Sequence, residues 1–169
     1  MKFAGIACLV GACCGMGWYF SQRLITQQKN LALFLQLMER MKEEIRYHAG
    51  SVAAMIAALA AQPPYDGIAV FRILHEQTAG GHDFYQAMKN ALHDCQKELA
   101  LEAEDIRLVL LFAGDIGVSD AEGQIAHCDR CIALVKARLT QLREKNTPRI
   151  KLFRSGGILA GIFLAIVLL

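Results

Sequence analysis

LLFAGDIGVSDAEGQI, residues 110–125, joins two runs of apolar residues that have helical spacing. Between those runs it is rich in glycine, aspartate and serine, the residues that punctuate regular structure. Apolar residues recur every three or four positions along each run: the first contains Leu99, Ala103, Ile106, Leu110 and Ala113, and the second contains Ile125, Cys128, Ile132, Val135, Leu139 and Leu142. Such stripes predict two amphipathic helices, each of which buries one face against neighbouring helices.

The polar segment itself is predicted to be the corner between these two helices. Gly114 or Gly117 can supply the left-handed residue that ends the first helix. Ser119 and Glu122 have the capping-box spacing that starts the second. A phosphate-binding loop is disfavoured because no strand precedes the glycines and no lysine follows them.

Motifs for catalysis or metal binding are weak. Asp115 and Asp120 would need a substrate pocket that nothing else in the sequence suggests. Cys128 and Cys131 form a C-x-x-C beside His127, which is half a zinc ligand set and lacks the strand–helix context of a redox motif. Because Cys128 also belongs to an apolar stripe, core packing is favoured. We predict a non-enzyme without catalytic residues, cofactor or metal; the alternative is a membrane-anchored redox or metal-binding protein using Cys128 and Cys131.

The whole middle of the chain is predicted to be helical. No stretch between residues 24 and 148 shows the sustained alternation of a strand. Gly50-Ser51, Pro63-Pro64 and Gly80-Gly81 separate helices, and Ser51 is suited to cap the one that follows it. An early helix is marked by an apolar stripe formed by Leu31, Phe34, Met38, Met41 and Ile45. The fold class predicted is all-α, a multi-helix bundle flanked by N- and C-terminal transmembrane helices.

Both ends of the chain are apolar. Every Asp, Glu, Lys and Arg except Lys2 falls between Arg23 and Arg154. At about 1.5 Å per residue, the uncharged run over residues 3–20 comes close to the hydrocarbon thickness of about 30 Å. The uncharged run over residues 155–169 is too short to cross the hydrocarbon layer by itself. The residues just before it supply the missing length. We predict three parts: an N-terminal transmembrane helix over 1–22, a cytoplasmic helical bundle over 23–151 and a C-terminal transmembrane helix over 152–169.

Other interpretations of the ends stay open. The N-terminal run can be a cleaved signal peptide, or a lipoprotein signal cut before Cys13, which would place the middle outside the cytoplasm. The C-terminal run can be a buried helix.

Basic residues indicate the orientation and the surroundings. From Arg130 to Arg154 there are eight basic residues and one acidic residue. Basic flanks stay cytoplasmic, and those next to the second span, Arg149, Lys151 and Arg154, also favour anionic membrane lipids. Nucleic-acid binding is not predicted, because the basic residues alternate with apolar ones and not with stacking aromatic residues.

Both predicted spans carry glycines four residues apart. Gly11 with Gly15, and Gly157 with Gly161, each form the G-x-x-x-G pattern that lets membrane helices approach closely. These residues are candidates for helix packing in the membrane, including packing within a homo-oligomer, although glycine is also simply common in such helices.

Acidic residues precede the basic stretch. From Asp94 to Glu122 there are eight acidic and two basic residues. The favoured interpretation is that the acidic and basic helices pair inside one bundle. The alternative is an exposed acidic face for a basic partner.

Three places in the sequence carry a resemblance to a known family. Glu44-Ile45-Arg46-Tyr47 has the form E-I-x-Y. The start of the last span is marked by Lys151-Leu152 and then by Gly157–Gly161. Phe112, Ile116-Gly117, Asp120 and Gln124 have the form F-x-x-x-I-G-x-x-D-x-x-x-Q. On these motifs the chain resembles stage III sporulation protein AB, whose helical domain is similar to type II secretion system protein F. Ala113 stands where that family usually has glycine.

The resemblance implies a non-enzymatic platform in the secretion-like channel between mother cell and forespore. It implies a place in the mother-cell membrane facing the forespore, with the central domain cytoplasmic. The partners it implies are other channel components and the stage III sporulation protein AA ATPase. We predict that the ATPase docks at the corner formed by Asp115, Gly117, Asp120 and Gln124.

Overall fold

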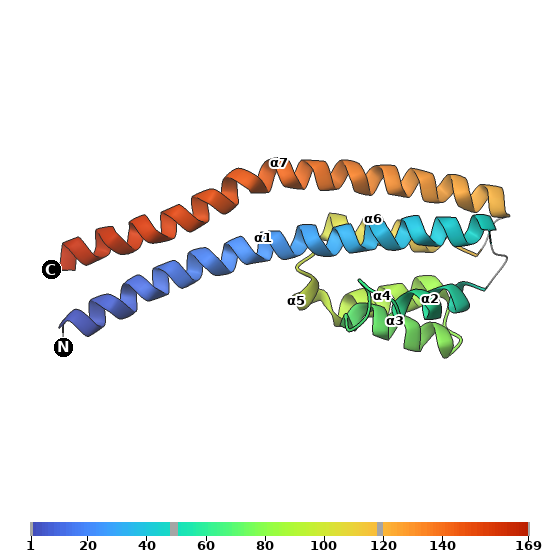
Figure 1. The fold of residues 1–169 in the computed structure, drawn as a ribbon, viewed down its shortest axis with the longest axis horizontal. Coiled ribbons are helices and arrows are strands. Elements are labelled where there is room, and N and C mark those ends of the chain that lie inside the picture. The colour runs from blue at the N-terminus through green and yellow to red at the C-terminus, as the bar shows by residue number, and fades with distance from the viewer. Residues whose placement is uncertain (1, 48–50, 118–119, 169) are drawn as a thin grey trace. The chain divides into compact units, whose positions relative to one another are not determined.

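The computed structural model describes residues 2–47, 51–117 and 120–168; within the two longest helices, the side chains of residues 2–10, 13–14, 154, 157–158, 160–162 and 164–168 are outside this description. The described residues form helices and no strand, so the all-α prediction is confirmed. The helices (Figure 1) are α1 (Lys2–Tyr47), α2 (Val52–Ala60), α3 (Ala69–Ala79), α4 (Phe84–Asp94), α5 (Gln96–Leu99), α6 (Ala103–Gly114) and α7 (Ala121–Leu168).

The chain folds into two compact units. One consists of Lys29–Leu139, and the other combines Met1–Gln28 with Thr140–Leu169. The long helices α1 and α7 contribute residues to both units.

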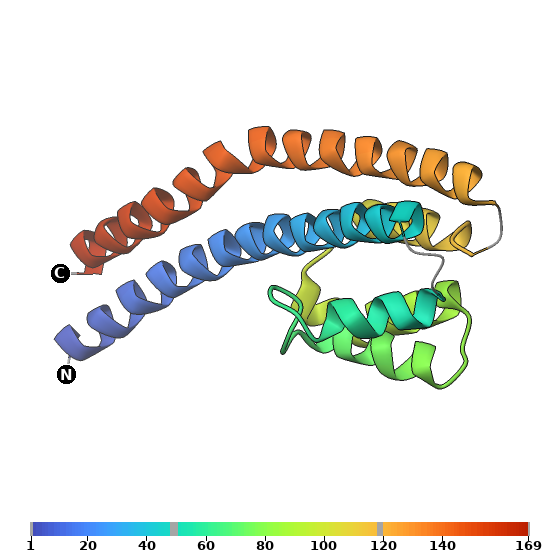
Figure 2. The same cartoon turned by 45° about the vertical axis from the view of Figure 1, so that its right-hand side comes forward.

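The core of the Lys29–Leu139 unit is built from the predicted stripes. Leu31, Phe34, Met38 and Met41 of α1 are at most 1% exposed, and Cys128 and Val135 of α7 are fully buried. Helix α3 packs on both α2 and α4 (Figure 2), and α4 packs on α6. Aromatic rings fill the space between the elements: those of Phe34 and Phe71 are centred 5.5 Å apart, and those of Phe84 and Phe112 are centred 6.4 Å apart.

Most of the residues predicted to cap or separate helices do so in the structure. Ser51 caps α2, since its Oγ accepts a hydrogen bond of 3.3 Å from the Ala54 N–H. Pro63-Pro64 lies between α2 and α3, and Gly81, with φ of 86°, lies between α3 and α4.

The predicted start of the helix before the corner is wrong. The stripe that begins at Leu99 is interrupted, because Leu99 ends α5 and Ala100 turns the chain with a left-handed φ of 53°. Helix α6 begins only at Ala103, after a capping box in which the Glu102 and Asp105 side chains each accept from the other residue's N–H. Leu99 is still buried, so the stripe predicted burial correctly and helix continuity incorrectly.

The second unit is an antiparallel pair of helical segments. The first part of α1 and the last part of α7 lie side by side (Figures 1 and 2). Gln28 Nε2 donates a 3.3 Å hydrogen bond to the Leu142 carbonyl, and the rings of Phe20 and Phe153 stack with centroids 5.7 Å apart. Helix α7 continues through Pro148.

Large apolar side chains of this unit remain exposed. Trp18, Tyr19 and Leu152 are 58%, 64% and 68% exposed. Across the described part of the chain, however, no helix has both the length and the apolar character needed to cross a membrane. The predicted transmembrane helices, residues 1–22 and 152–169, are therefore not supported by the structure.

Candidate functional site

The corner between α6 and α7 is held by hydrogen bonds among its own predicted residues. Gly117 has φ of 85°, so it is the left-handed residue that reverses the chain. Its N–H donates to Gln124 Oε1 at 3.2 Å, which ties the corner to the first turn of α7. Asp120 Oδ1 accepts from the Gly123 N–H at 3.1 Å and caps α7. The cap is thus one residue later than predicted at Ser119, which lies outside the described residues.

His127 connects the corner to the end of α6. Its side chain is buried, its Nδ1 lies 3.0 Å from Asp115 Oδ2, and its Nε2 lies 3.1 Å and 3.2 Å from the carbonyl oxygens of Leu111 and Phe112. Carbonyl oxygens at a helix C-terminus carry partial negative charge, and a ring N–H that donates to them is favourable there. His127 therefore caps the C-terminal end of α6.

Four candidate residues for partner binding therefore have distinct surroundings. Gly117 and Gln124 bond directly to each other, Asp120 caps α7, and Asp115 reaches across to His127. The side chain of Asp115 is 64% exposed, and Asp120 is exposed as well. Their docking role stays a prediction.

Two thiols lie next to His127. Cys131 Sγ is 3.5 Å from His127 Nε2, so Cys131, His127 and Asp115 are in the order of a nucleophile, base and orienting acid. Cys131 is only 1% exposed, however, and burial raises its pKa. Burial likewise raises the pKa of Cys128 to about 11. Reactive cysteines are accessible and have lowered pKa values, so these thiols act as core residues.

The geometry also weighs against the alternative function as a redox or metal-binding protein. Both thiols are free and buried, and the described residues contain no group of three or more His, Cys, Asp or Glu arranged to hold a metal ion.

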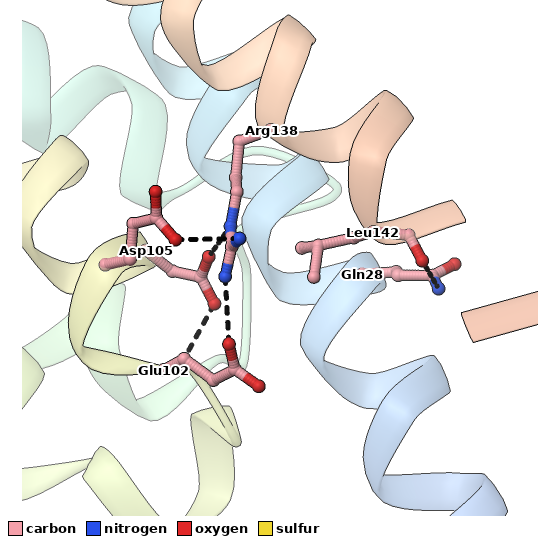
Figure 3. A network of polar contacts seen from close by, with 6 residues as sticks. Gln28, Glu102, Asp105, Arg138 and Leu142 are labelled. Carbon is pink, nitrogen blue, oxygen red and sulfur yellow. Dashed lines mark hydrogen bonds and ion pairs between the residues drawn. The ribbon is translucent and has the colours of Figure 1, made fainter. Parts of the chain in front are cut away.

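The opposite end of α6 is held by Arg138 of α7 (Figure 3). Its guanidinium Nε lies 2.8 Å from Asp105 Oδ1, and its other nitrogens lie 2.9 Å from Glu102 Oε2 and 2.8 Å from Glu104 Oε2. Arg138 is 7% exposed and Asp105 is fully buried. The three carboxylates raise the arginine pKa, although its burial opposes them and is the largest single influence. The prediction that the acidic helix pairs with the basic helix is confirmed here.

Sequence reasoning did not single out Arg138, although a signal was present. Arg138 follows Val135 by three residues and precedes Leu142 by four, so it lies on the buried face of α7. A charged residue on such a face requires a buried partner.

An open apolar groove runs between α4 and α6, beside the corner. It has a volume of about 510 Å³. Its lining includes Tyr85 of α4 and Ile106, Leu110 and Leu111 of α6, and it reaches Asp115 at its end. Exposed apolar surface of this kind marks contact with another molecule more often than single exposed side chains do.

The residues predicted to act in the membrane lie in the two-segment unit. A Cβ added at Gly11 or Gly15 would meet nothing within 4 Å, so the described part of the chain leaves this face open. The side chains of Arg149 and Lys151 are exposed. Gly157, Gly161 and Arg154 belong to α7, and their side-chain surroundings lie outside the described residues.

The family model described as stage III sporulation protein AB (spore_III_AB) matches residues 2–169. The chain belongs to this family. No curated protein and no solved structure gives a significant match.

Membership in the stage III sporulation protein AB family is consistent with a role in sporulation, and this is not a known enzyme family. The motif from Phe112 to Gln124 is one of the three that carry the resemblance, and the conformation of the corner explains why most of its residues are needed. Phe112 and Ile116 are buried, Gly117 turns the chain, and Asp120 and Gln124 make its hydrogen bonds. In this member of the family, the motif therefore specifies how α6 turns into α7.

Proposed function

We propose that this chain is a non-enzymatic membrane scaffold of a secretion-like channel required for endospore formation. It docks a cytoplasmic ATPase, which by resemblance is stage III sporulation protein AA. Membership in the stage III sporulation protein AB family over residues 2–169 is the observation that carries this proposal. The burial of both C-x-x-C thiols supports a scaffold over a redox protein.

Anchoring by both ends is part of the proposal. The uncharged runs at residues 3–20 and 155–169 supply the apolar sequence, and exposed aromatic residues such as Trp18 and Tyr19 suit the membrane boundary. Arg149 and Lys151 are exposed, which supports contact of their positive charges with anionic head groups on the cytoplasmic side. The central domain then faces the mother-cell cytoplasm.

Protease accessibility tests this anchoring. In intact spheroplasts, a protease added outside should leave residues 23–151 uncut, and detergent should render them cleavable. Digestion of the central domain without detergent would contradict the cytoplasmic orientation. Carbonate extraction that releases the full chain would contradict anchoring.

The corner is the proposed docking surface for the ATPase. Asp115, Asp120 and Glu122 place three exposed carboxylates within eight residues. The hydrogen bonds of Gly117, Asp120 and Gln124 fix the backbone that presents them. A fixed surface loses little conformational entropy on binding, which favours complex formation.

Charge reversal at Asp120 tests the docking surface. Full-length chain in detergent is mixed with purified ATPase, and co-purification is measured for the parent, Asp120→Arg and Asp120→Ala. Both variants lose the cap of α7, but only the first reverses the charge. Asp66→Arg, at an exposed carboxylate in the α2–α3 connection, is the control for a general charge effect. Binding should be lost most strongly in Asp120→Arg; retained binding in that variant would remove the corner from the proposal.

A further inference from the structure

Helix α6 has two apolar faces, and only one of them is buried in the core. Val109 and Phe112 lie on the buried face. Ile106 and Leu110 belong to the stripe that the sequence predicts to be buried, yet both are only half-buried, and the neighbouring Leu111 is 47% exposed. A stripe of this spacing normally packs on a neighbouring helix. The described residues of this chain cover the second face only in part, so it has the pattern of a helix-packing surface that is open to a partner.

This second face forms one side of the groove between α4 and α6. The lining residues of α6 make two rows with four-residue spacing, one at positions 103, 107 and 111 and the other at 106, 110 and 114. Such rows are the ridges between which the side chains of a second helix pack. From Ala103 to Gly114 the groove is about 16 Å long, or three helical turns. Its form therefore fits a helix of about three turns.

Arg107 is the charged lining residue that is available to such a helix. It is exposed, and within the described ranges it has no ion-pair partner. The other charged lining residue, Asp115, already lies 3.0 Å from His127 Nδ1. Tyr85 completes the lining from α4, and tyrosine and arginine are the side chains most enriched at binding hot spots. An occupant should therefore carry an apolar stripe with a carboxylate at its edge.

We propose that this groove binds an amphipathic helix of the ATPase, whose apolar stripe packs on Ile106, Leu110 and Leu111 and whose aspartate or glutamate pairs with Arg107. The inference rests on the proposed docking of an ATPase and adds the chemistry by which the partner is recognised.

Continuity with the corner favours the ATPase as the occupant. The groove reaches Asp115, which is also one of the predicted docking residues of the corner. One groove of this length is smaller than a standard protein interface, so it needs an adjacent surface. The exposed carboxylates of Asp115, Asp120 and Glu122 supply that surface. Groove and corner together have the apolar centre and polar rim that protein interfaces share.

Filling the groove gives a test that leaves every charge in place. A Cβ built at Gly114 would meet only Tyr85 Cδ2, at 3.9 Å, so a larger side chain at position 114 has room to project into the groove. Full-length chain in detergent micelles is titrated with purified ATPase, and co-purification is measured. Gly114→Phe should weaken binding at least about tenfold, because its ring occupies the place of the incoming helix. Gly114→Ala is the matched control and should bind like the parent.

Charge reversal tests the predicted carboxylate. Arg107→Glu should weaken binding about tenfold, since it places like charges together. Lys97→Glu, at an exposed cation that does not line the groove, is the control for the change in net charge. The Arg107→Glu chain is then mixed with ATPase variants in which each Asp or Glu is changed singly to Lys. At least one of these variants should restore binding, and it identifies the partner carboxylate.

Each result decides the inference, provided that circular dichroism shows the variants folded. Failure of the parent to bind the ATPase would overturn both the docking proposal and this inference. Binding that is abolished by Asp120→Arg and unchanged by Gly114→Phe and Arg107→Glu would overturn the groove alone. Binding that is lost in both groove variants and retained in Asp120→Arg would support the groove and exclude the corner.

Two further outcomes would also overturn the inference. If no lysine substitution in the ATPase restores binding to the Arg107→Glu chain, the predicted ion pair does not exist. If Gly114→Phe reduces self-association of differently tagged chains and leaves ATPase binding unchanged, the groove belongs to a second copy of this chain.

Discussion

Removal of Arg138 should destabilise the fold far more than removal of an ordinary surface arginine. Asp105 is fully buried and Arg138 is 7% exposed, so Arg138→Met leaves a carboxylate without its charged partner inside the protein. Breaking a buried pair in this way costs about 3–5 kcal/mol. Glu102 and Glu104 add little, since their side chains are 55% and 52% exposed and exposed pairs contribute about 0.2–1 kcal/mol each.

The same reasoning predicts an unequal series of variants. Glu104→Gln should cost no more than about 1 kcal/mol, because it removes one solvent-screened pair. Asp105→Asn combined with Arg138→Met should recover most of the loss, since no unpaired charge remains buried. In the parent, Asp105 accepts a hydrogen bond of 2.9 Å from the Glu102 N–H. The amide oxygen at position 105 of the double variant can still accept this hydrogen bond.

Urea unfolding of the full chain in micelles, followed by circular dichroism, measures these differences. The free energy of unfolding should fall in the order parent, Glu104→Gln, double variant and Arg138→Met. A cost for Arg138→Met below about 1 kcal/mol would show that Asp105 is solvated or protonated without the arginine, and would refute the buried-pair account. A double variant no more stable than Arg138→Met would refute it equally.

Three further perturbations test the corner and the thiols. Gly117→Ala should cost about 1–2 kcal/mol because its φ of 85° strains a Cβ, whereas Gly114→Ala, inside α6 with φ in the ordinary range, should be neutral or stabilising by thermal melting. Asp120→Ala should lower the melting temperature through loss of about 1 kcal/mol of capping, and Asp120→Asn should retain it. Cys128 has its pKa raised to about 11 from an ordinary 9.0, so the folded state holds the thiol proton more tightly. That stability is present below pH 9 and falls by about 2–3 kcal/mol as pH rises to 11; unfolding at several pH values should show this loss in the parent and not in Cys128→Ala.

Helix positions and buried faces were predictable because they depend on local spacing. The stripe from Leu31 to Met41 is buried as predicted, and Pro63-Pro64 separates two helices because proline cannot continue either one. The turn at Gly117 was also predictable, since a left-handed residue at a helix end is usually glycine.

Contacts between distant residues were not predictable from spacing alone. Nothing local to Arg138 indicates that it will meet three carboxylates more than thirty residues earlier, and nothing local to His127 indicates that it will meet Asp115 and two carbonyl groups of α6. The break after Leu99 was missed for a different reason. Ala100 adopts a left-handed φ that alanine rarely takes, and the capping box of Glu102 and Asp105 provides the compensation.

These two unpredicted contacts together determine what α6 can do. Arg138 fixes its first turn through Glu102, Glu104 and Asp105, and His127 fixes its last turn through backbone carbonyls and Asp115. Both anchoring residues come from α7, eleven residues apart, so α6 is clamped along its length against a single helix. A segment held at both ends cannot easily rotate or slide, so the corner that follows α6 keeps a constant position against α7. This arrangement favours the docking surface proposed at the corner, because a preformed surface loses little conformational entropy when a partner binds.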